Sequence, residues 1–354
     1  MKVLVCPHVD PYYSSFYLYG LEKLFGKKNI FYTMRGFGDI LPHLWYNVYM
    51  AFIIEDENGA TKYVIDSNDY NTVKKDVYDW CDVYGHCNAN FSTYSQSDYP
   101  KLVVLCPSFG VRCWNIVETI HHCVSNLFKL HFRVPSIKKY IWRYYKQYKR
   151  RPYKEYTTKM ENTQYRYKLN LYLYCCNTLW YNTGNLNNDK GLNYIRTQYI
   201  DACRETPNVI FEGGLVPAWR SRKQTSKFKD YLTSGVSAKV YLAKTKQSMA
   251  VFNTPAFWDC HGWKLGEYMA LGKCIISTPL SNELPTPKEC IAEDDKSWIS
   301  KYFCIIDRNK QSMKDAIEYI KMHPEYKDEL EERITKYWQE NGSPEASLKR
   351  LGIK

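Results

Sequence analysis

The sequence predicts an α/β protein with two doubly wound, Rossmann-like domains. Its 354 residues are enough for two domains with separate hydrophobic cores. Short apolar runs alternate with amphipathic segments in both halves, which is typical of sheets covered by helices. Hydrophobic residues make up 45% of the chain and charged residues 24%, a composition typical of soluble globular proteins and not of disordered ones.

In the first half, five apolar runs predict strands and two amphipathic segments predict helices. The predicted strands are 2–6, 30–33, 49–54, 62–65 and 102–106, and the predicted helices are 15–25 and 114–130. The loop 7–10 follows the first strand. It therefore lies at the carboxyl end of that strand.

A basic and aromatic segment comes next. Residues 138–159 contain nine basic residues and one acidic residue, Glu155, together with seven Tyr or Trp residues. Ser136 is a plausible helix N-cap, and Pro152 ends the helical pattern. Three interpretations remain open: the solvated face of a surface helix, a surface for anionic bilayer lipid, and a nucleic-acid-binding segment.

The second half repeats the alternation. The predicted strands are 169–175, 209–211, 239–243, 251–253, 274–277 and 303–306, and the predicted helices are 193–204, 263–271 and a charged C-terminal segment, 313–349. We therefore expect an N-terminal domain at 1–135, a connecting segment at 136–166, a second domain at 167–325, and a C-terminal helix at 326–354 that crosses back to the first domain.

The stretch 251–287 is the most informative part of the chain. A short apolar strand is followed by the polar loop 254–262, a helix, Gly272 as its C-terminal cap, and a second apolar strand. The loop therefore lies outside the carboxyl end of a parallel strand and leads into a helix N-terminus. Such a corner binds anions, because backbone N–H groups and the helix dipole point at it.

The same stretch resembles a known donor-site motif. Asp259, seven residues, Glu267 and then Tyr268-Met269-Ala270-Leu271-Gly272 resembles the C-terminal motif of GT-B glycosyltransferases of the retaining, bacterial polysaccharide type. The resemblance implies two domains facing a cleft, with Glu267 holding the ribose hydroxyls of a nucleotide-sugar. The family has a glutamate where this chain has Asp259, whose side chain is one methylene shorter.

Further donor-side roles follow from the resemblance. His261 would lie beside the donor sugar and phosphate, and Asp259 would stabilise or orient the sugar; these two are the predicted catalytic residues. Gly262 would allow close backbone approach. Lys190, in a Lys-Gly element, and Lys264, at the start of the helix, compete to bind the diphosphate.

Two other loops complete the predicted site. Gly213 and Gly214 are expected to form a turn after the strand 209–211 and to contribute to donor binding, together with the basic residues that follow them. In the first domain, His8 and Asp10 are the acceptor-side candidates, because in the family this loop faces the interdomain cleft. A plain polar turn is an equally good interpretation of those two residues.

Several chemistries have no signature in the sequence. There is no Asp-x-Asp pair, Walker loop, GxGxxG, HExxH or GxSxG. The thirteen cysteines form no CxxC pair and have no zinc-site spacing, so we expect reduced thiols, no metal site and no cofactor. Helix N-terminal amides and basic side chains would then meet the leaving-group charge.

The sequence thus predicts a metal-independent glycosyltransferase of the hexosyltransferase type, which moves a sugar from a nucleotide-diphosphosugar to a glycan or lipid-linked acceptor. A nucleotide-sugar epimerase of the same fold is one alternative, and a nucleic-acid-binding protein that uses the basic segment is another. No run approaches the roughly 18–20 apolar residues of a membrane span, and the N-terminus has no secretory signal pattern. We expect a cytoplasmic protein that associates peripherally with the inner face of the membrane.

Overall fold

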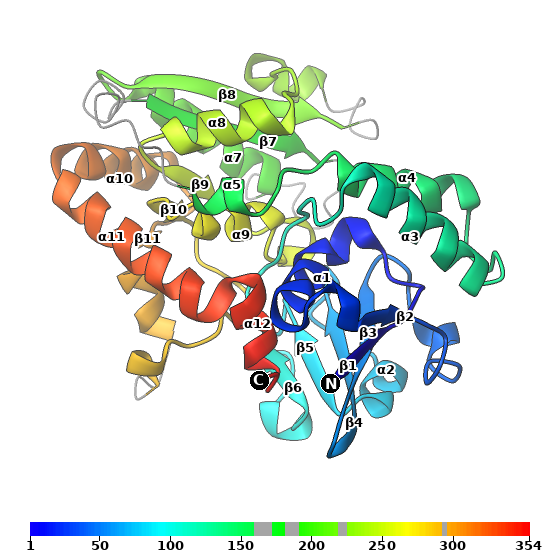
Figure 1. The fold of residues 1–354 in the computed structure, drawn as a ribbon. Coiled ribbons are helices and arrows are strands. Elements are labelled where there is room, and N and C mark those ends of the chain that lie inside the picture. The colour runs from blue at the N-terminus through cyan, green and yellow to red at the C-terminus, as the bar shows by residue number, and fades with distance from the viewer. Residues whose placement is uncertain (159–171, 181–190, 219–224, 292–295) are drawn as a thin grey trace. The chain divides into compact units, whose positions relative to one another are not determined.

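The computed structural model describes residues 1–158, 172–180, 191–218, 225–291 and 296–354 (Figure 1). The chain divides into two compact units. Unit 1 comprises Met1–Glu155, Asn282–Pro285 and Gln339–Lys354, and unit 2 comprises Tyr156–Ser281 and Thr286–Trp338. Each unit contains mainly parallel strands together with helices, which confirms the predicted α/β class.

Unit 1 contains a six-stranded sheet in the order β2-β1-β3-β4-β5-β6 (Figure 1). Its strands are β1 (Lys2–Val5), β2 (Ile30–Tyr32), β3 (Tyr49–Asp56), β4 (Gly59–Asp66), β5 (Val83–His86) and β6 (Leu102–Val104). Strand β3 is antiparallel to β1 and β4, and the other neighbours pair in parallel. β3 and β4 form a hairpin with a two-residue turn, so the sheet is parallel except for this one inserted strand.

The helices of unit 1 begin at recognisable capping residues. They are α1 (Pro11–Phe25), α2 (Lys75–Trp80), α3 (Ile116–Lys129), α4 (Ile137–Tyr148) and α12 (Pro344–Arg350), and α5 (Lys154–Thr157) lies where the chain passes from unit 1 to unit 2. Asn115 and Glu118 form a capping box at α3, and Ser136 caps α4 as predicted. α4 packs against α1 and α3, so residues 136–155 of the expected connecting segment belong to unit 1.

The described residues of unit 2 form five strands, all parallel to their partners. They are β7 (Tyr172–Leu179), β8 (Ile210–Pro217), β9 (Val251–Asn253), β10 (Ile275–Ser277) and β11 (Cys304–Ile305). β10 pairs with both β9 and β11, and β7 pairs with β8. The amide of Met249 donates a hydrogen bond to the carbonyl of Tyr172 (2.8 Å), which joins the two sets of strands edge to edge.

The α-helices that the structure describes in unit 2, beyond α5, are α7 (Leu192–Glu205), α8 (Ala238–Gln247), α9 (Trp263–Ala270), α10 (Lys310–Met322) and α11 (Pro324–Tyr337). One buried core includes side chains from β7, β9, β10, α7 and α10. Within it, the ring of Tyr199 on α7 stacks on Phe252 of β9 with centroids 3.9 Å apart. This packing holds α7 against the strands whose carboxyl ends carry the candidate site.

Short 3-10 and π-helical turns connect the main elements. They are η1 (Lys27–Asn29), η2 (Leu41–His43), η3 (Gln96–Asp98), η6 (Ser226–Tyr231), η7 (Phe257–Asp259), η8 (Lys288–Cys290), η9 (Lys296–Lys301) and the π-helix η10 (Trp338–Gly342).

Two predicted elements are wrong. The segment 239–243, predicted as a strand, lies inside α8. Ser237 caps this helix, and its buried side chains, Leu242 and Thr245, are three residues apart, which is a helical spacing. The C-terminal segment is not one helix, since Pro324 and Pro344 each begin a new helix at its first turn. The sequence prediction also missed α2 and β5.

All thirteen cysteines are free thiols, as expected for a reduced chain. In the described part of the chain, no helix combines the length and the apolarity that crossing a bilayer requires.

Candidate functional site

The candidate site lies at the carboxyl edge of the strands of unit 2. β9 and β10 are parallel, so their carboxyl ends share one edge, and the loop 254–262 leaves β9 at that edge and leads into α9. Gly262 occupies the N-cap of α9, and no side chain caps this end. The βαβ unit predicted from 251–277 is therefore confirmed, with Gly272 in the left-handed conformation (φ 61°) after α9.

Arg196 on α7 extends to this edge of the strands. Its side chain is buried, with 6% of its surface exposed. Nη1 donates to the carbonyl of Thr178 at the end of β7 (2.8 Å), and Nε donates to Oγ1 of Thr254 after β9 (3.4 Å). Burial lowers the pKa of Arg196 to about 10, so the guanidinium stays charged at neutral pH.

Lys264 brings a second cation to the same edge from the first turn of α9. Its Nζ donates to the carbonyl of Cys176 and to Oδ1 of Asn177 (2.8 Å), both near the carboxyl end of β7. The ammonium group also lies over the ring of Tyr241, 5.4 Å from its centroid. Burial lowers the pKa of Lys264, because desolvation penalises its charged form.

Neither cation forms an ion pair with a carboxylate of the described residues. The ion pairs of unit 2 are made by other basic residues, whereas Arg196 and Lys264 are bonded to carbonyl, amide and hydroxyl oxygens. A desolvated positive charge that makes no ion pair is unfavourable, and a bound anion would offset its desolvation. The electrostatics of this edge therefore suit a phosphate or diphosphate group.

Glu267 is one helical turn beyond Lys264 on α9. Its side chain is buried, and its charge acts on both neighbouring groups: it raises the pKa of Lys264 and that of Tyr241, although burial remains the largest influence on each. A carboxylate can accept two hydrogen bonds from a vicinal diol. The structure thus places the predicted ribose ligand and one of the predicted diphosphate ligands on the same short helix.

The loop before α9 contains two consecutive non-glycine residues in the left-handed region. Trp258 has φ 57° and Asp259 has φ 59°, a conformation that is unusual for a bulky side chain and costs of the order of 1–2 kcal/mol per residue. Asp259 is exposed to solvent, whereas His261 is buried. The two predicted catalytic residues therefore lie in one strained loop but in different environments.

Gly213 and Gly214 do not form the predicted turn. They lie in the middle of β8, paired with Cys175 and Cys176 of β7, because the strand continues to Pro217. Gly213 has φ 129°, and a Cβ atom there would lie 1.9 Å from the carbonyl oxygen of Cys175. Gly213 thus allows close contact between the two strands, and Gly214 allows the approach of the carbonyl oxygen of Tyr231, which would lie 2.4 Å from a Cβ atom there. Lys190 lies outside the described residues.

In unit 1, His8 and Asp10 follow β1 as predicted and belong to a buried polar cluster. Asp10 caps α1 through a 2.9 Å bond from the amide of Tyr12, and its Oδ2 lies 3.4 Å from Nε of Arg143. Burial raises the pKa of Asp10 to about 6 despite the nearby guanidinium. Burial also lowers the pKa of His8 to about 4, and its ring lies edge-on to Tyr46 with centroids 5.3 Å apart.

Comparison with known proteins gives structural similarities at low sequence identity. No protein-family model matches the chain, and a search of curated proteins gives no match. Solved structures that resemble it include Staphylococcus aureus MnaA with UDP (12% identity, TM-score 0.36, covering 76% of this chain and 66% of that one). A glycosyltransferase from Rickettsia africae has 11% identity and a TM-score of 0.39, with 79% and 66% coverage.

A third similar structure is the UDP-GlcNAc 2-epimerase of Neisseria meningitidis bound to UDP-GlcNAc, with 11% identity, a TM-score of 0.39 and coverage of 79% of this chain and 62% of that one. This chain thus spans just under two thirds of the length of these proteins. UDP and UDP-GlcNAc are ligands of those proteins.

Arg196 is the site residue that the sequence prediction missed. Its position on α7 gave one usable signal, because it falls on the same helical face as the buried Leu192, Tyr199 and Ile200. A basic residue on an otherwise buried face needs a polar partner or a ligand. Among the described residues, no group of three or more His, Cys, Asp or Glu side chains is arranged to hold a metal ion.

Proposed function

We propose that unit 2 binds a nucleotide-diphosphosugar, with the diphosphate at Arg196 and Lys264 and the ribose at Glu267. The observation that carries this proposal is the pair of cations at the carboxyl edge of the strands, the buried Arg196 and the half-buried Lys264, neither of which forms an ion pair in the described chain. Lys190 is a further proposed diphosphate ligand on the basis of its sequence pattern alone. Gly262, at the N-cap of α9, would let the backbone approach the phosphates.

The reaction that suits this site is glycosyl transfer. The bond between the anomeric carbon and the diphosphate oxygen would break, and an acceptor hydroxyl oxygen would form the new bond and lose its proton. Negative charge then develops on the departing diphosphate, where two desolvated cations stabilise it more strongly than in water. We propose that these side chains take the role that a divalent metal ion takes in other transferases.

The residues near the sugar have separate proposed roles. His261, buried beside the N-terminus of α9, would contact the donor sugar or its phosphate. Asp259 would stabilise or orient the sugar from the strained loop. On the acceptor side, His8 is unprotonated at neutral pH because burial lowers its pKa to about 4, and Asp10 forms an ion pair with Arg143.

The acceptor that we propose is a glycan or a lipid-linked glycan, and the place of action is the cytoplasmic face of a membrane. The support is the basic and aromatic helix α4, which carries four lysines or arginines and no acidic residue. Nucleic acid is the less favoured partner of this helix.

Calorimetric titration with nucleoside diphosphates and their sugars tests the donor site. Wild-type protein should bind at least one of UDP, GDP, ADP and dTDP or its sugar. Glu267→Gln, Arg196→Met and Lys264→Met should each weaken binding about tenfold or more, since each removes a charge-assisted contact. Arg204→Met is the matched control, because Arg204 is an exposed arginine on the same helix as Arg196.

Two results would contradict the proposal: no binding across this set, or equal weakening by Arg204→Met. Incubation with the donor that binds then separates the reaction types. An epimerase converts the nucleotide-sugar in the absence of an acceptor, whereas a glycosyltransferase transfers the sugar only when an acceptor is added.

A further inference from the structure

α3 and α4 pack against each other in unit 1, and some of their polar side chains are buried. Nδ2 of Asn126 donates to the hydroxyl of Tyr144 (3.1 Å), which also accepts from the hydroxyl of Tyr140 (3.1 Å). Nε2 of Gln147 donates to the carbonyl of Val111 (3.3 Å). A surface helix of a globular protein usually buries its apolar side chains, so the burial of Asn126 and Gln147 departs from the common pattern.

The outer face of the two helices is apolar. Ten aliphatic or aromatic side chains on α3, α4 and the turn between them are exposed: Ile116, Val117, Ile120, Val124, Phe128, Phe132, Ile137, Ile141, Trp142 and Tyr145. Val117 is 72% exposed and Phe128 is 61% exposed. We call this set the α3–α4 face. Contiguous apolar surfaces of this kind mark interaction sites in soluble proteins.

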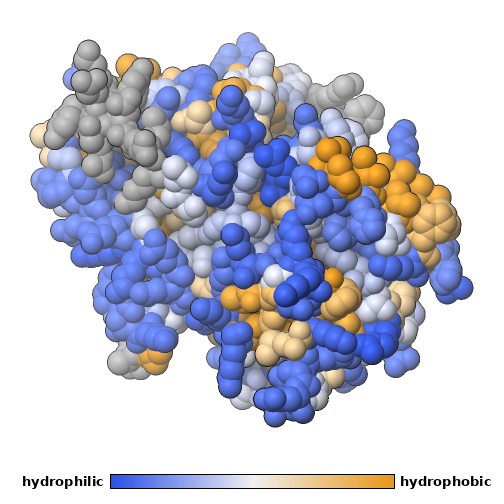
Figure 2. Space-filling model, viewed as in Figure 1, coloured by the Kyte–Doolittle hydropathy of each residue, from blue (hydrophilic) through white to orange (hydrophobic). Residues whose placement is uncertain are grey.

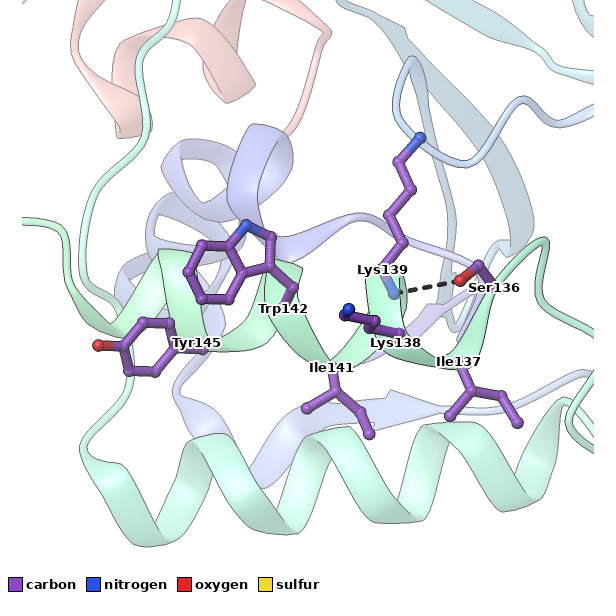
Figure 3. A pocket seen from close by; sticks show the side chains of 7 residues that line it. All are labelled: Ser136, Ile137, Lys138, Lys139, Ile141, Trp142 and Tyr145. Atoms are coloured by element: carbon purple, nitrogen blue, oxygen red, sulfur yellow. Dashed lines mark hydrogen bonds between the residues drawn. The ribbon is translucent and has the colours of Figure 1, made fainter. Parts of the chain in front are cut away.

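The α3–α4 face is visible as a cluster of hydrophobic residues on the right of the space-filling view (Figure 2). Beside it lies a hollow of about 1050 Å³, whose described lining residues all belong to α4 and its N-cap, Ser136. Figure 3 shows Ile137 and Ile141 projecting from the same side of α4, one turn apart. The hollow is mainly apolar and is open to solvent.

Positive charge surrounds this apolar surface. Residues 116–150 contain eight lysines or arginines and a single acidic residue, Glu118, whose carboxylate is paired with Lys27. Two of the lysines lie over rings of the face: Nζ of Lys146 is 4.9 Å from the centroid of Trp142, and Nζ of Lys149 is 6.0 Å from that of Tyr145. The basic groups therefore lie at the edge of the apolar surface and not apart from it.

We propose that the α3–α4 face docks onto the surface of an anionic lipid bilayer. Aliphatic side chains with a basic border match a membrane interface, where acyl chains lie beneath negatively charged headgroups. A second copy of the chain would bring two positively charged borders together. A nucleic acid would match the charge but would leave the aliphatic side chains of α3 unpartnered, since bases stack on aromatic rings.

The helices lie flat on the bilayer in this mode. α3 has 14 residues and α4 has 12, which is shorter than the roughly 20 residues that span a hydrocarbon core. Their apolar side chains enter the boundary between headgroups and acyl chains, and the lysines contact the headgroups. The sequence pattern points to 138–159, and the structure extends the surface to α3, which supplies five of the ten apolar side chains of the face.

Co-sedimentation with vesicles tests the proposal. Full-length protein should sediment with vesicles of phosphatidylglycerol and phosphatidylcholine, should remain in the supernatant with phosphatidylcholine alone, and should dissociate from the anionic vesicles as salt is raised. Equal sedimentation with both kinds of vesicle, or with neither, would overturn it.

Substitutions within the face separate the apolar contribution from a general loss of hydrophobicity. Val117→Ser combined with Phe128→Ser should weaken vesicle binding roughly tenfold or more, because two largely exposed apolar side chains no longer enter the lipid. The matched control is Ile291→Ser combined with Met322→Ser, since these unit 2 side chains are each 70% exposed. The control should bind vesicles as wild type does.

A charge-matched pair tests the basic border. Lys138→Glu with Lys146→Glu should weaken binding to anionic vesicles roughly tenfold or more, since each basic residue near such a surface contributes about fivefold. Lys28→Glu with Lys229→Glu changes the net charge equally at exposed lysines outside the face and should have a much smaller effect.

Three further results would overturn the proposal. In the first, a test variant and its matched control lose vesicle binding equally. In the second, the protein is a dimer in sedimentation velocity, and the Val117 and Phe128 substitutions dissociate it. In the third, the protein binds oligonucleotides tightly, and the Lys138 and Lys146 substitutions abolish this binding. All four double variants should retain wild-type nucleotide affinity, so a failure of membrane docking is distinguishable from a failure of the proposed donor site.

Discussion

At the scale of single residues, we expect Arg196 to contribute to nucleotide binding but little to the stability of the free protein. Its charge is buried against a carbonyl and a hydroxyl, and it contributes little to the stability of the free protein. Replacing a buried charge by an apolar side chain of similar volume is often neutral or stabilising. We therefore expect Arg196→Met to have a free energy of unfolding no more than about 1 kcal/mol below wild type, or higher, while it loses nucleotide affinity.

Thermal denaturation with and without the bound nucleotide checks this expectation. The wild-type midpoint should rise with ligand, because only the folded state binds it, and the midpoint of Arg196→Met should stay almost constant. A strongly destabilised variant that still binds nucleotide normally would show that Arg196 has a structural role only.

His8 should make unit 1 less stable in weak acid. Its folded pKa is about 4, below the value of about 6.5 for an exposed histidine, so between these pH values the unfolded chain binds the extra proton. The stabilisation is complete above pH 6.5 and is lost as pH falls toward 4. Asp10 acts in the opposite sense, because burial raises its pKa to about 6.

The difference between wild type and His8→Phe separates the contribution of His8 to the pH dependence of the unfolding free energy from that of Asp10. The variant keeps an aromatic ring against Tyr46 but has no group to protonate. On going from pH 7 to pH 5, we expect wild type to lose roughly 1–2 kcal/mol more unfolding free energy than the variant. Urea denaturation at the two pH values measures this, and parallel pH profiles would contradict it.

At the scale of elements, β7 and β8 depend on the absence of a side chain at Gly213. A Cβ atom at this position would lie 1.9 Å from the carbonyl oxygen of Cys175, and φ is 129°. Gly59 is a matched control, because it has the same φ of 129° with nothing within 4 Å of a new Cβ. Gly59→Ala should cost about 1–3 kcal/mol from backbone strain alone.

Gly213→Ala should cost several kcal/mol more than Gly59→Ala, since β7 and β8 must separate to admit the methyl group. Chemical denaturation of the two variants checks this. Equal losses of unfolding free energy in the two variants would mean that β7 and β8 can separate to admit the methyl group without further cost.

The βαβ unit at 251–277 could be predicted because each boundary has a local cause. Two buried runs too short for helices are divided by a polar loop, and Gly272 ends the helix in the left-handed conformation. In contrast, α8 has only a short apolar run, in which alternation and helical spacing are hard to tell apart. Its buried Leu242 and Thr245 are fixed by tertiary packing.

The candidate site could be predicted only where its residues belong to one contiguous motif. Glu267 and Lys264 belong to a contiguous motif, and the structure places both at the carboxyl edge of the strands. Arg196 lies about seventy residues earlier in the chain and reaches the edge only because α7 packs on β7 and β9. Gly213 and Gly214 show the converse, because a pair of glycines is equally compatible with a turn and with two strands in close contact.

At the scale of the whole molecule, neither unit is continuous in sequence. Residues Gln339–Lys354 belong to unit 1, where α12 packs on α1 so closely that a Cβ at Gly20 would lie 2.8 Å from Leu348. Each unit nevertheless has a buried core of its own, formed by apolar side chains around its strands. Units of this size with separate cores commonly unfold as separate cooperative transitions.

Two matched core substitutions should assign these transitions. Leu348 on α12 and Ile317 on α10 are both fully buried, and truncating either to alanine should cost about 2–5 kcal/mol. In scanning calorimetry, a nucleotide that binds unit 2 should raise only one transition. Ile317→Ala should lower that transition, and Leu348→Ala should lower the other one.

This pattern would also locate nucleotide binding in unit 2 without relying on any site substitution. Nucleotide should still raise the lowered transition of Ile317→Ala and should leave the lowered transition of Leu348→Ala unchanged, because a ligand stabilises only the unit that binds it. A single transition that both variants lower equally would mean that the units unfold together. A nucleotide shift confined to the transition that Leu348→Ala lowers would place the donor in unit 1, and the proposed roles of Arg196, Lys264 and Glu267 would then be wrong.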